Sequence, residues 1–228
     1  MTTTTWAPWG ADPYADALSA DPYAEALRAG KGPLRLRSDD GRLLPLDVER
    51  WCADADAADL SALRRCEGAV LDAGCGPGRL VAALTAQGRR ALGIDVSAAA
   101  VAHTLRGGGA ALCRSVFDPL PGEGRWGSVL LLDGNLGIGG DPAALLARVA
   151  GLLAPRGLLI AETQPSEDLD EHLTVRLDDG TATAAAQAPF PWARLGSRAL
   201  LRYALPAGWS SSAQWSVGER SFLALRRP

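Results

Sequence analysis

The centre of the sequence reads Val70-Leu71-Asp72-Ala73-Gly74-Cys75-Gly76-Pro77-Gly78-Arg79-Leu80. The apolar run that begins at Ala69 predicts a buried strand, and the spacing of Leu80, Val81 and Leu84 predicts a helix. The three glycines between them carry no Cβ, so a ligand can lie directly against the main chain. A strand, a glycine turn and a helix also bring backbone N–H groups and a helix N-terminus close to a ligand. The stretch therefore predicts a ligand site at the end of a strand.

Two acids follow the next two apolar runs. Asp95 ends the run Ala91–Asp95 and lies 17 residues after Gly78. In a strand–helix–strand unit this places a carboxylate beside the glycine turn, where it can accept hydrogen bonds from both hydroxyls of a ribose. Asp118 follows the third run and could accept from the amino group of an adenine. The place where a dinucleotide fingerprint needs a small residue holds Arg79, which disfavours a nucleotide-binding oxidoreductase. The pattern favours an adenosyl ligand.

The run Asp72 to Gly78, with Gly93-Ile94-Asp95 and Asp118, resembles the class I S-adenosylmethionine-dependent methyltransferases. The resemblance covers roughly residues 67–162. It implies S-adenosylmethionine as the cofactor and methyl transfer to a small-molecule acceptor, through an oxygen or nitrogen nucleophile, by in-line displacement. The cofactor-binding residues that it implies are Asp72, Gly74, Cys75, Gly76, Gly78, Asp95, Val96, Phe117, Asp118 and Asp133. Two alternatives are an ordinary nucleotide-binding α/β domain and a protein that binds S-adenosylmethionine without methyl transfer, such as an interaction partner or a cofactor-assisted isomerase or cyclase.

Three residues are candidates for catalysis. Asp133 and Asn135 follow a fourth apolar run, whose end faces the transferred methyl group in the fold that the resemblance implies. Asp133 would lie near the sulfonium, and Asn135, which can donate and accept, would orient the acceptor. The alternative is a loop that satisfies its own backbone through Asx turns. His172 is a candidate general base because histidine titrates near neutral pH, or else an exposed hairpin residue.

Other side chains are candidates for an acceptor pocket or a metal site. Trp192, Tyr203 and Trp209 would either line an aromatic acceptor pocket or pack beneath the segment around them. An Asp-Asn pair at the end of the fifth apolar run would complete a magnesium site, but the sequence there is Glu162-Thr163-Gln164. We therefore expect no metal.

Composition restricts the class of protein further. The chain has 228 residues, of which 47% are hydrophobic, and a net charge of −3. Such a chain can form one α/β domain with a full core, and its charge argues against a broad nucleic-acid or anionic-membrane surface. The four cysteines lack zinc-ligand spacing, no signal peptide pattern is visible, and no apolar run approaches 18 residues. We expect a bacterial enzyme in a reducing cytoplasm, with a small-molecule acceptor and neither a nucleic acid nor a membrane as partner.

Apolar strands alternate with helical patterns through the centre of the chain, which predicts a parallel sheet. The fold class that we expect is α/β, with a Rossmann-like, mostly parallel seven-stranded sheet, helices on both faces and an antiparallel closing pair of strands. The predicted strands are Ala69–Asp72, Arg90–Asp95, Ala110–Phe117, Gly127–Asp133, Gly157–Glu162, Ser210–Val217 and Ser221–Arg226, and the predicted helices are Gly78–Gln87, Ser97–Leu105 and Pro142–Leu153. The connection from Asp118 to Arg125 is too short for a helix and predicts a loop.

Residues 1–66 are expected to form a cap packed on a core of residues 67–228. After a disordered tail, the repeated heptads Asp12–Leu18 and Asp21–Leu27 each predict a helix start. The other predicted elements are a hairpin of 33–37 with 42–46, in which Pro45 requires an edge position, helices at 47–52 and 54–66, a hairpin insertion of 172–177 with 181–187, and a helix over 191–203. By the resemblance the cap is a lid whose aromatic wall is Trp6, Trp9, Tyr14 and Tyr23; alternatively these side chains only fix the cap to the core.

Overall fold

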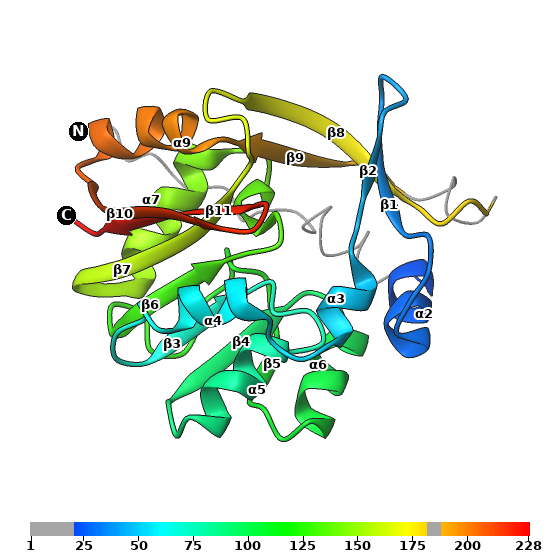
Figure 1. Ribbon diagram of the computed structural model, residues 1–228, viewed down its shortest axis with the longest axis horizontal. Coiled ribbons are helices and arrows are strands. Elements are labelled where there is room, and N and C mark those ends of the chain that lie inside the picture. The colour runs from blue at the N-terminus through cyan, green and yellow to red at the C-terminus, as the bar shows by residue number, and fades with distance from the viewer. Residues whose placement is uncertain (1–20, 182–187) are drawn as a thin grey trace, which may run out of the picture.

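A seven-stranded sheet forms the centre of the computed structural model, which describes residues 21–181 and 188–228 (Figure 1). The strand order is β10-β11-β7-β6-β3-β4-β5. Strands β3 to β7 run parallel, and β11 is antiparallel to both of its neighbours. The strands are β3 (Val70–Ala73), β4 (Ala91–Asp95), β5 (Ala111–Cys113), β6 (Trp126–Leu131), β7 (Leu153–Thr163), β10 (Ser210–Val217) and β11 (Arg220–Arg226). The expected fold class, including the closing pair of strands, is confirmed.

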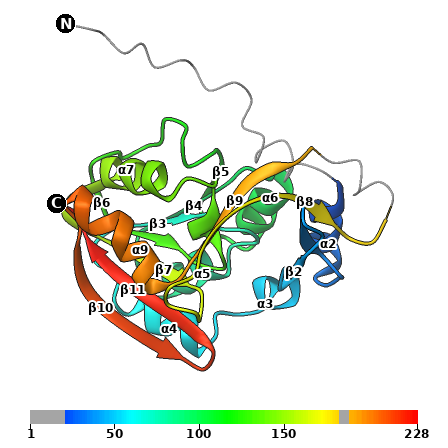
Figure 2. The ribbon, with the colours of Figure 1, turned by 90° about the horizontal axis from the view of Figure 1, so that it is seen from above.

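Helices cover both faces of this sheet (Figure 2). Successive side chains of a strand point to opposite faces, and in β6 Val129 and Leu131 belong to one core cluster while Leu130 belongs to the other. Helices α7 (Pro142–Leu152) and α9 (Ser197–Ala204) pack on the first cluster, and α4 (Ala57–Leu63) and α5 (Arg79–Ala86) pack on the second. Burial of both faces explains why the central strands are continuous apolar runs.

Local side-chain caps set the helix starts close to the predicted places. The Ser97 hydroxyl accepts a hydrogen bond from the Ala100 N–H at the start of α6 (Ala98–Arg106). The Asp141 carboxylate accepts one from the Ala144 N–H at the start of α7, where Pro142 occupies the first helical position. Both residue types are favoured there because they satisfy N–H groups that have no partner within the helix.

A second, four-stranded antiparallel sheet joins the N-terminal segment to the region after β7. Its order is β2-β1-β8-β9, with β2 (Leu43–Pro45), β1 (Arg35–Ser38), β8 (Asp170–Asp178) and β9 (Phe190–Leu195). Pro45 lies in the edge strand, as predicted. An isolated bridge pairs Trp192 of β9 with Ile138, which lies in the loop after β6. Helices α2 (Asp21–Ala29) and α3 (Val48–Cys52) lie beside β1 and β2 (Figure 1).

Four predicted elements differ from the structure. The third strand was expected to run to Phe117, but β5 ends at Cys113, because the Asp118 carboxylate accepts a hydrogen bond from the Ser115 N–H and closes a turn. Residues 191–195 form strand β9 where a helix was expected; Pro191 is tolerated because β9 is an edge strand. Residues 172–175 pair with β9, whereas their expected hairpin partner was 181–187. The helix expected over 54–66 is shorter, since Asp56 caps α4.

Some predictions fall outside the described residues. They are the first heptad, the lid residues Trp6, Trp9 and Tyr14, and the expected strand 181–187 beyond Thr181. Two short 3-10 helices, η1 (Asn135–Gly137) and η2 (Leu205–Ala207), complete the elements of the described part. Within residues 21–181 and 188–228, no helix combines the length and the apolar character that crossing a bilayer requires.

Candidate active site

The glycine turn lies between β3 and α5, as the sequence predicts. All three of its glycines have positive φ angles, from +53° to +91°, a region that residues with a Cβ rarely adopt. The N–H groups of Gly74 and Cys75 both donate to the Ile94 carbonyl at 2.9 Å, which fixes the turn to the end of β4. A Cβ on Gly76 would meet only the Tyr23 hydroxyl, at 3.6 Å. The main chain at Gly76 is therefore open to a ligand.

Asp95 ends β4 against this turn. Its Oδ2 accepts the N–H of Gly76 at 2.9 Å, and its Oδ1 accepts the N–H of Ser97 at 2.8 Å. Burial raises the pKa of Asp95 to about 6, although the hydrogen bonds from Ser97 and Gly76 act to lower that pKa. A carboxylate oxygen can accept more than one hydrogen bond. The Asp95 carboxylate can therefore hold the turn and still accept two hydroxyl groups.

Asp72 is a buried acid at the end of β3. Its Oδ2 has no hydrogen-bond partner. Burial raises the pKa of Asp72 to about 7, although the charge of Arg79 acts in the opposite direction. An unsatisfied buried carboxylate costs stability, and such groups cluster at functional sites. Asp72 lies two residues before Gly74, and one of its carboxylate oxygens remains for a donor group.

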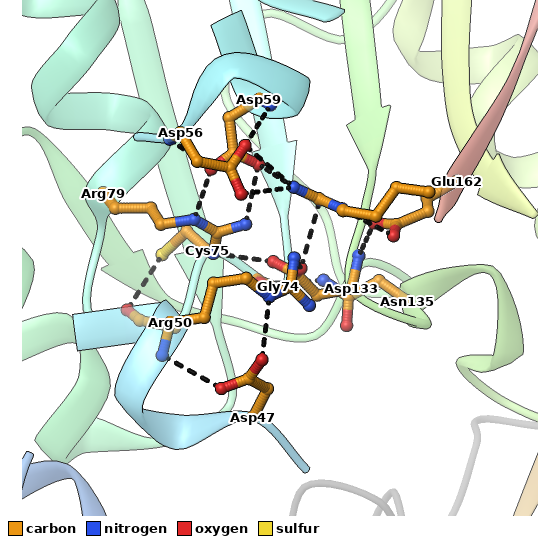
Figure 3. A network of polar contacts seen from close by, with 12 residues as sticks. Asp47, Arg50, Asp56, Asp59, Gly74, Cys75, Arg79, Asp133, Asn135 and Glu162 are labelled. Atoms are coloured by element: carbon orange, nitrogen blue, oxygen red, sulfur yellow. Dashed lines mark hydrogen bonds and ion pairs between the residues drawn. The ribbon is translucent and has the colours of Figure 1, made fainter. Parts of the chain in front are cut away.

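An ion-pair network joins five elements at the carboxyl end of the sheet (Figure 3). Asp133 lies at its centre and pairs with Arg50 at 2.8 Å, Arg79 at 2.7 Å and Arg220 at 3.4 Å. Its backbone has φ +57°, which is uncommon for a residue other than glycine, and its N–H donates to Glu162 Oε2 at 2.8 Å. These partners hold the strand end in a bent conformation that costs free energy by itself.

The arginines of the network also bind acids on neighbouring elements. Arg79 donates two hydrogen bonds of 2.9 Å to Asp59, whose side chain is fully buried. Arg220 donates to both oxygens of Glu162 at 2.8 Å and to Asp59 Oδ1 at 2.8 Å. Burial alone would raise the pKa of Asp59, but these guanidinium groups lower it to about 2. The network is thus a set of paired charges.

Asn135 connects the end of β6 to the glycine turn. Its Nδ2 donates to the Gly74 carbonyl at 2.8 Å. A Cβ on Gly74 would lie 2.5 Å from the same nitrogen, so Gly74 must be glycine for this contact to form. The bond crosses to another strand and is not an Asx turn within the loop. Asn135 supports the main chain on which a ligand would rest.

Two cavities meet at Asp133. The turn cavity, of about 50 Å³, is lined by Tyr23, Leu36, Leu46, Trp51, Gly74, Cys75, Gly76, Pro77, Arg79, Asp95, Asp133, Asn135, Phe190 and Trp192. The sheet cavity, of about 300 Å³, is lined by Leu36, Leu44, Pro45, Leu46, Arg50, Asp133, Gly134, Leu136, Glu162, Gln164, Trp192, Ala193, Arg194 and Leu195. Leu36, Leu46, Asp133 and Trp192 border both, so the cavities are neighbours. The β1 and β9 strands of the second sheet supply part of each wall.

The structure brings together most of the predicted site residues. Those that line the turn cavity are Gly74, Cys75, Gly76, Asp95, Asp133 and Asn135. Val96 lines a third, smaller cavity together with Ser115, and this cavity also borders Gly74 and Asp95. Gly78 instead allows α5 to approach α6, since a Cβ there would lie 2.5 Å from Thr104.

Three predicted residues lie elsewhere. Phe117 packs over Gly139, and Asp118 is exposed and closes the turn after β5, because that strand ends earlier than expected. His172 has a half-exposed side chain on β8 and is placed near the Gly140 carbonyl and the Tyr203 hydroxyl. None of the three lines the turn cavity or the sheet cavity.

Several residues of the site carry no local signal in the sequence. Arg50, Asp59 and Arg220 are far apart in the chain and meet only through the fold. For Asp59, the capping box that it forms with Asp56 at the start of α4 is a local pattern, but it predicts a helix start and not a place in the site. Among the described residues, no group of three or more His, Cys, Asp or Glu side chains is arranged to hold a metal ion.

Comparison with known proteins assigns the family. The family model described as a methyltransferase domain matches residues 47–211. This span contains the glycine turn, Asp95 and the loop after β6. The chain therefore belongs to this methyltransferase family. A search of curated protein sequences finds no significant match.

Solved structures share the fold at low sequence identity. A methyltransferase from Bacteroides fragilis in complex with S-adenosyl-L-homocysteine is 22% identical, with a TM-score of 0.73 and 94% of each chain covered. The 1,6-didemethyltoxoflavin-N1-methyltransferase from Burkholderia thailandensis is 20% identical, with a TM-score of 0.63, covering 98% of this chain and 93% of that one. The CcbJ methyltransferase from Streptomyces caelestis is 15% identical, with a TM-score of 0.56, covering 75% and 94%.

Proposed function

We propose that the protein transfers a methyl group from S-adenosylmethionine to an oxygen or nitrogen of a small-molecule acceptor. One observation carries the proposal: the open glycine turn and its buried acid Asp95 lie in a cavity that adjoins a second, larger cavity. A transfer enzyme needs two neighbouring sites, one for the donor and one for the acceptor. The Burkholderia thailandensis neighbour, whose structure contains bound 1,6-didemethyltoxoflavin, supports an acceptor of this size class.

The residues at the turn fit the parts of an adenosyl cofactor. Asp95 accepts the ribose hydroxyls, because its oxygens have room for two more hydrogen bonds. The open main chain at Gly76 lets the ligand lie close. The buried oxygen of Asp72 attracts the cofactor's amino group from behind the turn. Val96 and Ser115, which line the third cavity, contact the adenine in our proposal, in place of Phe117 and Asp118.

In the reaction, the cofactor supplies a methyl group on a sulfonium, which is already a good leaving group. The protein must therefore align the acceptor and exclude water. Tyr23 and Trp51 meet edge to face, with ring centroids 6.3 Å apart, and cover the turn cavity with Trp192. Asp133, on the border of both cavities, places a carboxylate near the transferred group. Asn135 keeps the glycine turn in place.

The cap must move for this function. The turn cavity measures about 50 Å³, whereas ligand pockets typically have roughly 300–1,000 Å³. The smallest change that enlarges it is displacement of the aromatic side chains supplied by α2 and α3. We therefore propose that residues 21–66 act as a cap that opens for the cofactor and closes over it.

A reducing cytoplasm as the working compartment agrees with four cysteines that form no disulfide.

Calorimetric titration with S-adenosylhomocysteine tests the donor site. Gly76→Val should abolish binding, because the side chain would project into the open space above the turn. Gly88→Val is the matched control, since Gly88 also has a positive φ, +69°, with nothing within 4 Å of an added Cβ. Equal binding by both variants would move the cofactor away from the glycine turn. Methyl transfer is then measured as tritium leaving methyl-labelled S-adenosylmethionine; a protein that binds the cofactor but labels no acceptor would be a binding protein.

A further inference from the structure

The sheet cavity is lined by both apolar and polar side chains. Its apolar surface includes Leu36, Leu44, Leu46, Leu136 and Leu195, and the Trp192 ring lies at the border to the turn cavity. These side chains can bury apolar surface of an occupant, so the polar lining decides which charge the occupant can carry. The identity of the occupant rests on the proposed function, in which this cavity holds the acceptor.

Every charged group that lines the sheet cavity has a partner of opposite charge. Arg50 pairs with Asp133 at 2.8 Å and with Asp47 at 3.2 Å. Arg194 pairs with Glu171 at 2.8 Å and donates to Gln164 Oε1, also at 2.8 Å. The remaining acid, Glu162, is bound by Arg220. An anionic acceptor would have to displace one of these carboxylates to obtain a cation, which costs the free energy of a desolvated ion pair.

The described lining of the sheet cavity also offers no unpaired base that could remove a proton from the acceptor. A hydroxyl acceptor needs a base within hydrogen-bond reach. In the described part of the chain, the carboxylates lining the sheet cavity are Asp133 and Glu162, and arginines hold both. The ring of His172 lies near Gly140 and Tyr203, and that of His103 contacts the Pro77 carbonyl. Neither histidine lines either cavity.

We infer that the sheet cavity takes an uncharged acceptor whose nucleophile is a nitrogen lone pair. The lone pair forms the new N–CH₃ bond while the C–S bond breaks, and the electron pair of that bond stays on sulfur. The nitrogen then carries the positive charge, and where it bore a hydrogen it gives that proton to solvent. The reaction therefore requires neither a base nor an unpaired cation in the cavity.

The position of Asp133 suits this transfer of charge. With a neutral nitrogen, one positive charge is present before and after the step and only moves from sulfur to nitrogen. Asp133 borders both cavities, so its carboxylate faces the path of that charge. With an anionic oxygen, the two charges would instead cancel, so no positive charge would remain for Asp133 to face.

Three bicyclic probes of similar size distinguish the acceptor classes: isoquinoline, which offers a neutral nitrogen, 2-naphthol, which offers a hydroxyl, and 2-naphthoate, which is an anion. Their binding is measured by calorimetry at pH 7.5 on the full chain saturated with S-adenosylhomocysteine. We expect isoquinoline to bind at least tenfold more tightly than 2-naphthoate. With methyl-labelled S-adenosylmethionine, tritium should enter isoquinoline in preference to 2-naphthol, at a rate that does not rise with pH.

A charge variant tests the reason for this preference. Glu171→Gln leaves Arg194 without its carboxylate partner, so 2-naphthoate should bind at least tenfold more tightly than to the wild type, with isoquinoline little changed. Glu167→Gln is the matched control, because it removes one carboxylate partner of Arg198, which does not line the sheet cavity. This control should leave the affinities of all three probes unchanged.

The outcomes separate this inference from the proposed function. If the wild type does not bind S-adenosylhomocysteine, the proposed function itself is wrong. If S-adenosylhomocysteine binds but 2-naphthoate binds as tightly as isoquinoline, or 2-naphthol is the better methyl acceptor, the inference is wrong and the function stands. If S-adenosylhomocysteine binds and none of the probes does, the sheet cavity is not the acceptor site. An unchanged 2-naphthoate affinity in Glu171→Gln would also refute the argument from charge.

Discussion

Replacement of Asp95 by asparagine tests the proposed cofactor site. The substitution keeps the shape of the side chain but removes its charge. In the free protein both carboxylate oxygens accept backbone N–H groups, from Gly76 and Ser97. An asparagine amide would have to face one of these donors with its own N–H group. The variant should therefore lose about 1–3 kcal/mol of folding free energy, the usual cost of an unsatisfied buried donor.

The loss in cofactor affinity follows from the same geometry. A hydrogen bond to a charged group contributes about 1.5–3 kcal/mol to binding, and two ribose hydroxyls would donate to Asp95. Asparagine keeps one oxygen, so we expect the binding free energy to fall by roughly 2–3 kcal/mol, a 30- to 150-fold rise in Kd. Calorimetric titration with S-adenosylhomocysteine measures this. Asp118→Asn is the control, because Asp118 is exposed, and its Kd should match that of the wild type.

The pH dependence provides a second, independent test. Burial raises the pKa of Asp95 to about 6 in the free protein, and the ionised form is the one that accepts both hydroxyls. Affinity should therefore rise with pH through this value and be about tenfold lower at pH 5 than well above the pKa. Asp95→Asn should lose this dependence. A wild-type Kd that is equal at both pH values, or an unchanged Kd in Asp95→Asn, would refute the assignment of the ribose to Asp95.

The other predictions concern neighbouring parts of the site. Burial raises the pKa of Asp72 from 3.8 to about 7, so the folding stability that depends on its protonation is present at low pH and is lost as pH rises from about 4 through about 7. In urea unfolding of the cofactor-free protein, Asp72→Asn should therefore be more stable than the wild type at pH 8 but not at pH 4. Equal unfolding midpoints at pH 8 would contradict this. Asn135→Ala should lower turnover by about tenfold while Kd for S-adenosylhomocysteine changes little, since lost alignment acts on the transition state; full turnover would show that the contact with Gly74 is structural only. His172→Ala should change neither turnover nor its pH profile, and a loss that shrinks at high pH would restore the histidine as a base. Amides of α2 (Asp21–Ala29) should exchange more slowly with S-adenosylhomocysteine bound, whereas equal protection would make the cap static.

Part of this site is encoded in short stretches of sequence. The apolar run before Gly74, the glycines without Cβ and the acid at the end of the next run specify β3, the turn and Asp95 through local geometry. Helix starts at Ser97 and Asp141 were predictable for the same reason, since a cap acts within three residues. These features need only their neighbours in the chain, and the structure keeps them within a residue or two.

The predictions from local sequence were wrong at β5 and β9, which are edge strands of the two sheets. The run up to Phe117 is apolar, but β5 pairs with β4 alone, and the turn at Ser115 and Asp118 ends the strand early. The pattern of residues 191–195 is only weakly helical, and pairing with β8 makes them a strand. A neighbouring strand contributes hydrogen bonds that outweigh local preference, and no short window of sequence contains that neighbour.

Only the tertiary structure assembled the rest of the site. Arg220 contacts Asp59 across 161 positions of the chain, and the strands β1 and β9 that wall both cavities come from its opposite ends. Ion pairs and cavity walls at such separations leave no periodicity or spacing to detect. Their free energy depends on burial and on distances of a few ångströms, quantities that exist only once the chain has folded. The sequence therefore determined the glycine turn and Asp95, and the fold determined the ion-pair network and the walls of the cavities.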